Sequence, residues 1–428
     1  MMVSLTRRAV VAAAVTAGLL AAASPALASP ATARIRAGTT TGWPQLQGNA
    51  AHTGFEPAET SVTSSNVGQL AEAWTAPLSS ASNLIGTEGM TVAGGTVYGT
   101  SVTAVIALNA VTGAQRWQAS LPGVVASTPA VQGGLVITGY NVSHGFAETT
   151  YIVALNAATG ARVWTHLVPA AHLIASVTTT PTTVYAALDT GQILALHAGT
   201  GVQQWLSAVL PGCQLSAPSV SGGLVVAGNG GQYVTALHAA DGTKAWQNKF
   251  NNGCGNGANV WVPSISGSTV YAGLLNGVRA LNLDSGRVLW ANRAAGHVFQ
   301  PLSVTGTAVI AGANNDFEPV ALARSTGALL WQSPFQSQMS VGAFATFGSL
   351  TWVLANDFVN STVQAVAFDP ATGHQAFSSA AYPDPAVNSL PPVAAAGRVY
   401  LDLATEVLCL TLHGARTGVD VHTEGAAW

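Results

Sequence analysis

Charged residues are scarce in this sequence. Asp, Glu, Lys and Arg together make up 7% of its 428 residues, and lysine occurs only at Lys244 and Lys249. Proteins that bind nucleic acid or an anionic membrane surface do so through clustered Lys and Arg side chains. Because the sequence has no such cluster, we expect neither partner.

Helical periodicity is also missing. After about the first thirty positions, no window repeats its apolar residues at the helical spacing. At the N-terminus, Arg7-Arg8 precedes an apolar run at residues 9–23, and Ala26-Leu27-Ala28 offers a small-x-small cleavage site. Residues 1–28 are therefore predicted to be a signal peptide cleaved near Ala28, with an apolar run too short to span a membrane. We expect a secreted or extracytoplasmic protein without a transmembrane anchor, exported by the general or the twin-arginine route.

What the sequence does contain is one motif in seven copies. The run from Ala107 to Trp117 carries Gly113 at its seventh place and an aromatic residue at its eleventh. It returns at 154–164, 195–205, 236–246, 280–290 and 321–331, and in degraded form at 367–377, where Phe377 replaces the Trp. The motif aromatics follow one another at intervals of roughly 41 to 47 residues, a period that predicts repeated supersecondary units.

A second repeat lies upstream of each motif. Val92–Tyr98 places Gly94-Gly95 between apolar residues, which predicts a hairpin. Related runs occur at 131–137, 220–226, 265–271 and 304–310, with weaker copies at 183–185, 348–352 and 397–400. Two hairpins per period give four strands, the content of a propeller blade. Eight upstream hairpins therefore predict an all-β fold, an eight-bladed β-propeller of four-stranded antiparallel blades.

The motif Ala-x-Asn/Asp-x-x-Thr-Gly-x-x-x-Trp resembles the tryptophan-docking repeat of the pyrroloquinoline quinone (quinoprotein) type of β-propeller. The resemblance covers residues 43–413, and the opening run 42–54 looks like the lead-in of that family. It implies that each Trp stacks against the Ala of its own motif and the Gly peptide of the next. The side chains concerned are Trp117, Trp164, Trp205, Trp246, Trp290 and Trp331. The resemblance favours the non-enzymatic branch of the family, whose best-known member helps assemble outer-membrane proteins, over its dehydrogenases.

The repeats also predict the organisation of the chain. After the signal peptide we expect a flexible leader at 29–42, a propeller at 43–418 and a C-terminal tail at 419–428. The strand at 70–76 is expected to close the ring as the outer strand of the last blade, since closure removes open sheet edges. The alternative is closure by a poor copy of the motif at 412–421. We expect a monomer.

Cysteine is rare, with three residues. Cys213 and Cys254 follow Trp205 and Trp246 at equal offsets, which places them on the same rim of adjacent blades. In an exported protein this favours a disulfide between them. The alternative is two unpaired loop thiols too far apart for a disulfide. Cys409 is predicted to be a small buried hydrophobic residue.

Candidate binding residues lie in the loops between the repeats, which share one rim of the propeller. Aromatic, imidazole and carboxylate groups there could bind a flat or sugar-like ligand. They are His172, Trp261, His297, Phe299, Phe335, Tyr382 and Asp384. The alternative is that these loops are only connections, because Asn and Gly recur there as turn formers.

The dehydrogenases of the resembled family use an adjacent pair of cysteines, a carboxylate and amide set for calcium, and an Asp base. This sequence has no adjacent cysteines, and its acidic residues are scattered. We therefore expect no catalytic residue, no cofactor and no metal, in an exported propeller that binds or scaffolds a protein or small ligand at one rim. Two alternatives stay open: a pyrroloquinoline quinone-dependent dehydrogenase with calcium and a divergent site, and a cell-surface module that binds a glycan.

Overall fold

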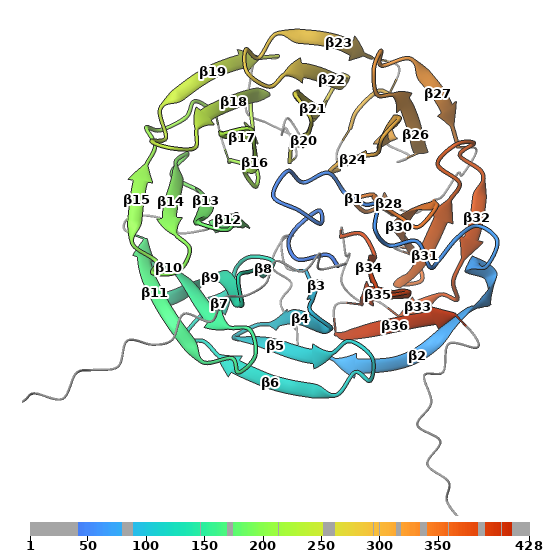
Figure 1. The fold of residues 1–428 in the computed structure, drawn as a ribbon, viewed down its shortest axis with the longest axis horizontal. Coiled ribbons are helices and arrows are strands. Elements are labelled where there is room, and N and C mark those ends of the chain that lie inside the picture. The colour runs from blue at the N-terminus through green and yellow to red at the C-terminus, as the bar shows by residue number, and fades with distance from the viewer. Residues whose placement is uncertain are drawn as a thin grey trace, which may run out of the picture. The chain divides into compact units, whose positions relative to one another are not determined.

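The computed structural model describes residues 42–78, 89–145, 147–168, 174–212, 214–250, 262–293, 295–298, 300–313, 318–333, 340–357, 359–383, 390–403 and 405–412. All of them belong to one compact unit, Ala37–Trp428. They form eight β-sheets set radially around an axis, each built on four antiparallel strands (Figure 1). The only helix in these ranges is the short 3-10 helix η1 (Val67–Gln69). The predicted all-β, eight-bladed propeller is confirmed.

The blades are numbered here in chain order, and their strands are given from the axis outwards. Blade one contains β3 (Thr91–Ala93), β4 (Thr96–Ser101), β5 (Ala104–Asn109) and β6 (Gln115–Ser120), and blade two contains β7 (Val124–Val125) with β8 (Ala130–Gln132), β9 (Leu135–His144), β10 (Ala147–Asn156) and β11 (Arg162–Val168). Blade three contains β12 (Ile174–Thr179), β13 (Thr183–Leu188), β14 (Ile193–His197) and β15 (Gln203–Leu206). Blade four contains β16 (Ser219–Ser221), β17 (Leu224–Asn229), β18 (Tyr233–His238) and β19 (Lys244–Lys249).

Blades five to eight follow the same plan. Blade five contains β20 (Ser264–Ser266), β21 (Thr269–Leu274), β22 (Gly277–Asn282) and β23 (Val288–Asn292), and blade six contains β24 (Ser303–Val304), β25 (Ala308–Ala313), β26 (Glu318–Ala323) and β27 (Leu329–Gln332). Blade seven contains β28 (Ser340–Val341) with β29 (Ala345–Phe347), β30 (Leu350–Asp357), β31 (Thr362–Phe368) and β32 (Gln375–Ser378). Blade eight contains β34 (Val393–Ala395), β35 (Arg398–Asp402), β36 (Glu406–Leu412) and β2 (Leu70–Pro77). Blade seven also holds β1 (Phe55–Glu56), parallel to β29, and β33 (Tyr382–Pro383), beside β31.

The repeated motif is the outer hairpin of blades one to seven, whereas β36 and β2 form the outer pair of blade eight. In blade one, Ala107 lies opposite Tyr98 on one side and opposite Trp117 on the other, and the register with the outer strand shifts directly after Ala107. The same shift follows the motif Ala in blades two to seven. Gly113 turns the hairpin with a φ of 72°, a conformation that glycine adopts at little cost. One short sequence therefore specifies the turn and the bulge of each outer hairpin.

The motif Trp side chains contact the following blade. Trp117 Nε1 donates to the carbonyl of Ala157 at 3.0 Å, and a Cβ placed on Gly160 would lie 2.7 Å from the Trp117 ring. The other five indoles make the same kind of bond: Trp164 to Ala198, Trp205 to Ala239, Trp246 to Leu283, Trp290 to Arg324 and Trp331 to Pro370. Their contribution to holding the ring together stays a prediction.

The first and last blades meet through a strand from the N-terminal side of the chain. β2 pairs antiparallel with β36, so that Leu70 faces Leu412. Trp74 on β2 lies against blade one, where a Cβ on Gly113 would be 2.7 Å from its ring. Of the alternative closing motif at 412–421, only Leu412 belongs to the described residues.

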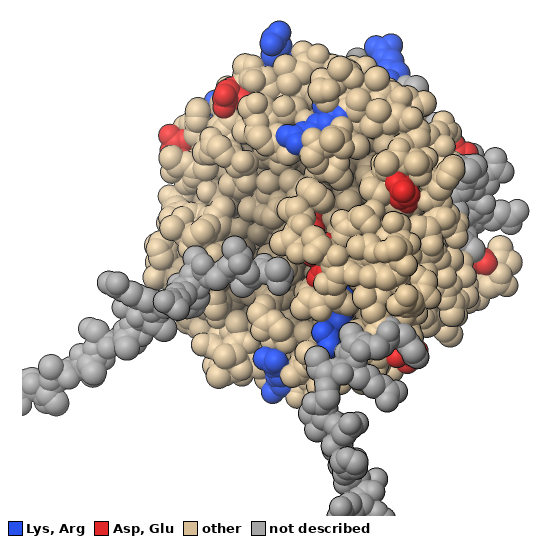
Figure 2. Space-filling view, turned by 45° about the vertical axis from the view of Figure 1, so that its right-hand side comes forward, with Lys and Arg blue, Asp and Glu red and all other residues tan. Residues whose placement is uncertain are grey.

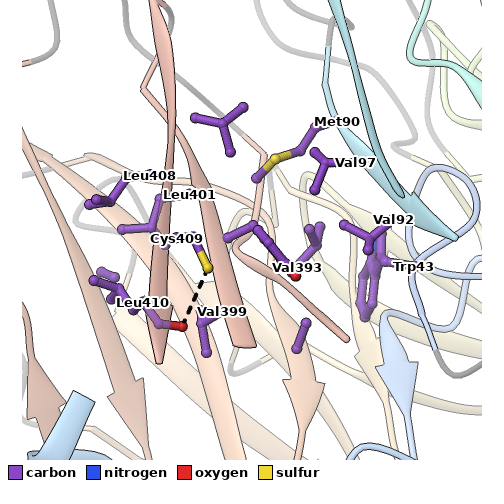
Figure 3. Close-up of a cluster of buried hydrophobic side chains, with 14 of the residues drawn as sticks. Trp43, Met90, Val92, Val97, Val393, Val399, Leu401, Leu408, Cys409 and Leu410 are labelled. Atoms are coloured by element: carbon purple, nitrogen blue, oxygen red, sulfur yellow. Dashed lines mark hydrogen bonds between the residues drawn. The ribbon is translucent and has the colours of Figure 1, made fainter. Parts of the chain in front are cut away.

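The junction of blades eight and one is filled by apolar side chains (Figure 3). Cys409 lies among them with none of its surface exposed, and its Sγ is 3.8 Å from the carbonyl of Leu410. The predicted burial of Cys409 is confirmed. Trp43 packs beside Val92 at the same junction.

Trp43 belongs to residues 42–56, which we name the axial segment. This segment runs inside the ring of blades, close to their innermost strands (Figure 1). It ends in β1, and an exposed link at Pro57 and Ala58 leads on towards β2.

Candidate functional site

The predicted rim consists of the turns between the second and third strands of each blade and the connections to the next blade. Two of the predicted residues are described. His297 is exposed in the connection from β23 to β24, and Tyr382 is half-buried on β33. Blade six lies between these positions along the ring, so they belong to separate parts of the rim (Figure 1).

The other predicted residues cannot be placed. His172, Trp261, Phe299, Phe335 and Asp384 lie outside the described residues, as do Cys213 and Cys254. The rim site and the disulfide therefore stay predictions.

Burial alters the pKa of Tyr382 and of Cys409. Burial, with a smaller contribution from the Glu72 carboxylate, raises the pKa of the Tyr382 phenol, which is therefore protonated at neutral pH and able to donate a hydrogen bond. Burial raises the pKa of the Cys409 thiol to about 12. Because the thiolate is the reactive form of cysteine, Cys409 is an inert side chain in the folded protein.

His52 of the axial segment is completely buried between blades three and four. Its Nε2 lies 3.2 Å from Thr178 Oγ1 and its Nδ1 lies 3.1 Å from Ser219 Oγ. Ser219 donates its own proton to the carbonyl of Pro263, so Ser219 Oγ must accept from Nδ1–H, and Nε2 accepts from Thr178. Burial lowers the pKa of His52 to about 3. The imidazole is therefore neutral and acts as a hydrogen-bonded bridge between two blades.

A small cavity lies beside the axial segment. Trp43, Gln47, Thr128, Val393 and Asp402 are among its lining residues, and its volume is about 10 Å³. Gln47 is fully buried, and neither of its amide atoms has a hydrogen-bond partner among the described residues. A cavity of this size holds about one water molecule, which would satisfy Gln47.

The cofactor known from the resembled family does not fit this cavity. An organic cofactor needs a pocket of roughly 300 Å³ or more, far above the volume beside the axial segment. Across the described ranges, no three His, Cys, Asp or Glu side chains come together as a metal-binding group. The cavity beside the axial segment is therefore too small to hold the quinone.

A larger cavity opens between blades five and six. It has a volume of about 540 Å³, and its walls include Tyr271, Trp290, Thr307 and Arg324. Arg324 Nε donates to the Tyr271 hydroxyl at 3.2 Å, and its Nη atoms donate to backbone carbonyls of the turns in both blades. Arg324 has no carboxylate partner among the described residues.

No sequence motif predicted this cavity, although the sequence carries a signal for it. Arg324 occupies the motif position that is alanine in the first four copies, at Ala110, Ala157, Ala198 and Ala239. A long cationic side chain at a position that is alanine in four copies and uncharged in the other two marks a local departure from the repeat. Such departures are the places where a site is added to a repetitive scaffold.

The outer surface carries few charges and several exposed apolar side chains. Charged residues appear as isolated points on the face shown in Figure 2. Large exposed apolar residues concentrate on or beside the outer strands of two pairs of adjacent blades: Val163, Leu167, Val202, Leu206 and Val209 in blades two and three, and Val288, Leu289, Leu329 and Leu330 in blades five and six. Exposed apolar side chains are typical of interaction sites where they join into one patch.

Comparison with known structures identifies the same architecture. BamB from Moraxella catarrhalis is 18% identical, with a TM-score of 0.64 over 82% of this chain and 99% of that chain. The quinohemoprotein alcohol dehydrogenase from Comamonas testosteroni is 15% identical, with a TM-score of 0.67 over 87% of this chain and 80% of that one. A europium-containing methanol dehydrogenase is 14% identical, with a TM-score of 0.63 over 87% and 98%. At these identities the likeness shows the fold alone.

Sequence comparison adds the family. No curated protein matches the chain significantly. Among the described residues, no helix has the length and apolar character needed to cross a membrane. The family profile described as "Outer membrane protein assembly factor BamB" matches residues 58–209 and 148–316. These matches span more than half of the chain, so the protein belongs to this family of pyrroloquinoline quinone-type repeat propellers.

Proposed function

We propose that this protein is an exported, monomeric and non-catalytic propeller that holds a protein partner at one rim. The observation that carries the proposal is a group of apolar side chains on adjacent blades two and three. Leu167, Leu206 and Val209 are 49%, 43% and 66% exposed. Each lies at or after the end of an outer strand, where the chain passes to the next blade, and so towards the predicted rim.

The filled axis supports a scaffold rather than an enzyme. Enzyme sites are usually concave and enclose most of a small substrate, whereas the axial segment runs through the centre of this ring and the cavity beside it has room for about one water. The low surface charge supports an apolar protein contact over a charged ligand. The similarity to BamB, an assembly factor by its family description, agrees with this proposal.

Partner capture tests the proposal. The tagged mature protein is cross-linked in the extracytoplasmic fraction of its source cells, and the captured proteins are identified by mass spectrometry. We expect one defined partner whose yield falls about tenfold or more with the double variant Leu167→Gln, Leu206→Gln, since burial of each leucine contributes roughly 1.5–3 kcal/mol. The matched control is Val359→Gln, because Val359 is 81% exposed but lies on blade seven. Equal capture by the double variant and the wild type would contradict the proposal.

The dehydrogenase alternative needs its own experiment. Purified protein is incubated with pyrroloquinoline quinone and calcium, freed of excess quinone, and assayed for bound-cofactor absorbance and for dye-linked oxidation of alcohols and sugars. We expect neither signal. Stoichiometric bound quinone with substrate-dependent dye reduction would replace the scaffold proposal by an enzyme.

The cavity between blades five and six favours glycan binding as a second candidate function. Aromatic rings and hydroxyl groups are the usual lining of sugar sites, and Tyr271, Trp290 and Thr307 supply both. A glycan array with wild type and Arg324→Ala tests it, because Ala restores the residue found at the equivalent position of four other motifs. Binding by the wild type and its loss in the variant would support this function, and an array without signal would eliminate it.

A further inference from the structure

The innermost strand of each blade has one edge that no other strand of its blade covers. In β3, Thr91 and Ala93 pair with β4 on one side, so the N–H of the central residue, Val92, points to the other side, towards the axis. The same geometry recurs around the ring at the first residue of the five full upstream repeats, and at Thr179 and Thr346 ahead of two weaker copies. An N–H left unpaired in a buried place costs about 1–3 kcal/mol, so this edge requires an acceptor.

The axial segment supplies these acceptors, one for each of seven blades. The bonds run from Val92 N to Trp43 O (2.9 Å), Val131 N to Pro44 O (2.7 Å), Thr179 N to Gln45 Oε1 (2.9 Å), Val220 N to Ala50 O (2.6 Å), Ile265 N to Ala51 O (2.8 Å), Val304 N to Thr53 O (2.7 Å) and Thr346 N to Gly54 O (2.7 Å). The acceptors follow the same order along the segment as the blades follow around the ring. Outside the segment, Glu59 Oε2 accepts from Gly397 N of blade eight at 2.9 Å.

The conformation of the axial segment is adapted to this task. An extended chain passes straight across a ring, so the segment must coil to face seven blades in turn. It does so through four residues with left-handed backbone: Gln47 (φ 54°), Gly48 (φ 82°), His52 (φ 50°) and Gly54 (φ 60°). Two of these are not glycine, and such strain persists only where the surroundings hold it in place. At Gly54 a Cβ would lie 2.6 Å from Gln47 Oε1 and 2.9 Å from two backbone carbonyls.

Side chains set the register of the segment. Trp43 is 2% exposed and packs between blades eight and one. The Gln45 amide both donates to and accepts from the backbone of Thr179, and His52 bridges blades three and four. Backbone carbonyls alone would let the axial segment shift along the inner strands, because every residue carries one. The side chains of Trp43, Gln45 and His52 each fit only one position on the ring and so fix the register of the segment.

The blades are complete without the segment. Each of the eight sheets has its four strands, and β2 closes the ring independently. Only the two residues of β1 join a sheet, as an added parallel strand beside β29. We propose that the inward N–H groups of the ring form a peptide-binding site, and that the axial segment is a ligand for this site supplied by the chain itself.

A nicked protein tests this proposal. A protease-recognition sequence is inserted after Ala58 in the mature chain, in the exposed link, and the folded protein is cut there. The two pieces are expected to stay together in gel filtration, because the contacts to seven blades do not depend on the covalent link. A fluorescent synthetic peptide of residues 42–58 is then expected to exchange with the cut segment at a stoichiometry of one per ring, while circular dichroism retains the β signal.

Peptide variants make the test specific. A peptide with Gln45→Ala and His52→Ala is expected to bind at least about tenfold more weakly, since it loses the side-chain bonds to blades three and four. The matched control peptide carries Ala58→Ser at an exposed position and should bind as the wild type does. Equal affinity of the two variants, failure of the labelled peptide to exchange, or loss of the β signal when the segment leaves would each overturn the proposal.

A measurement on the uncut chain covers the case in which nicking harms folding. Gly54→Ala introduces the clash described above. We expect faster amide hydrogen exchange at the inward N–H groups, including those of Val92 and Val220 on distant blades, with unchanged exchange in the outer hairpins. Faster exchange confined to blades six and seven would show a local packing defect and would contradict a single ligand spanning the ring.

Discussion

His52 should make the stability of the propeller depend on pH. Its pKa is about 3 in the folded protein, against 6.5 for a free histidine, because burial takes the imidazole out of solvent and so disfavours its charged form. The unfolded chain therefore binds a proton below pH 6.5 that the folded chain refuses until about pH 3. The contribution of His52 to the free energy of unfolding is therefore fully present above pH 6.5 and decreases as the pH falls towards 3.

The size of the effect follows from proton linkage. Each pH unit between the two pKa values costs about 1.4 kcal/mol of unfolding free energy. Between pH 7 and pH 4 the loss from His52 alone is therefore about 3 kcal/mol, a large share of the stability of a typical domain.

Denaturant unfolding at pH 7, 5.5 and 4 measures this loss. In His52→Gln, which keeps a donor and an acceptor but does not titrate, the unfolding free energy should be lower than wild type at pH 7 and should fall less steeply with acid by about 3 kcal/mol. His374→Gln, at an exposed turn position, serves as the control and should keep the wild-type slope. Equal slopes for His52→Gln and the wild type would refute the assignment of His52 as a buried neutral bridge.

Three further predictions concern packing and reactivity. Trp205→Ala should lower the unfolding free energy by about 3–5 kcal/mol, because a buried indole and its bond to the next blade are lost; the exposed Gln203→Ala should change it by less than about 0.5 kcal/mol. Gly160→Ala should cost roughly 1–3 kcal/mol, since its φ is 72° and the new Cβ would meet the Trp117 ring; a smaller cost in thermal or denaturant unfolding would mean that the ring moves aside freely. Cys409 should not react with a thiol reagent at pH 8 until denaturant is added, because it is buried with a raised pKa; reaction of the native protein would show local opening of blade eight.

The blades could be predicted because the information for them is local. A turn glycine such as Gly113 and the Trp117 that follows it lie within one hairpin, and their recurrence gave the period. The eight upstream hairpins, each equally local, gave the number of blades and the fold. The burial of Cys409 followed in the same way, from an apolar strand pattern. Each of these properties depends on neighbours in the sequence.

The axial segment could not be predicted in the same way. Six of its seven acceptors are backbone carbonyls, such as those of Trp43 and Gly54, which every residue type carries and no motif reveals. His52 gave no signal either, because its partners Thr178 and Ser219 are more than a hundred residues away. The cavity beside Arg324 had a weak signal, an arginine where most copies have alanine, but the sequence did not show which turns its side chain would reach.

The sequence by itself thus determined the repeating unit, its turns and bulges, and the family of the protein, because strand pairing within a hairpin is a local property. The tertiary structure alone decided how the centre of the ring is filled. Seven N–H groups become one site only when the blades close around a common axis, and only then does a segment without periodicity become their shared ligand.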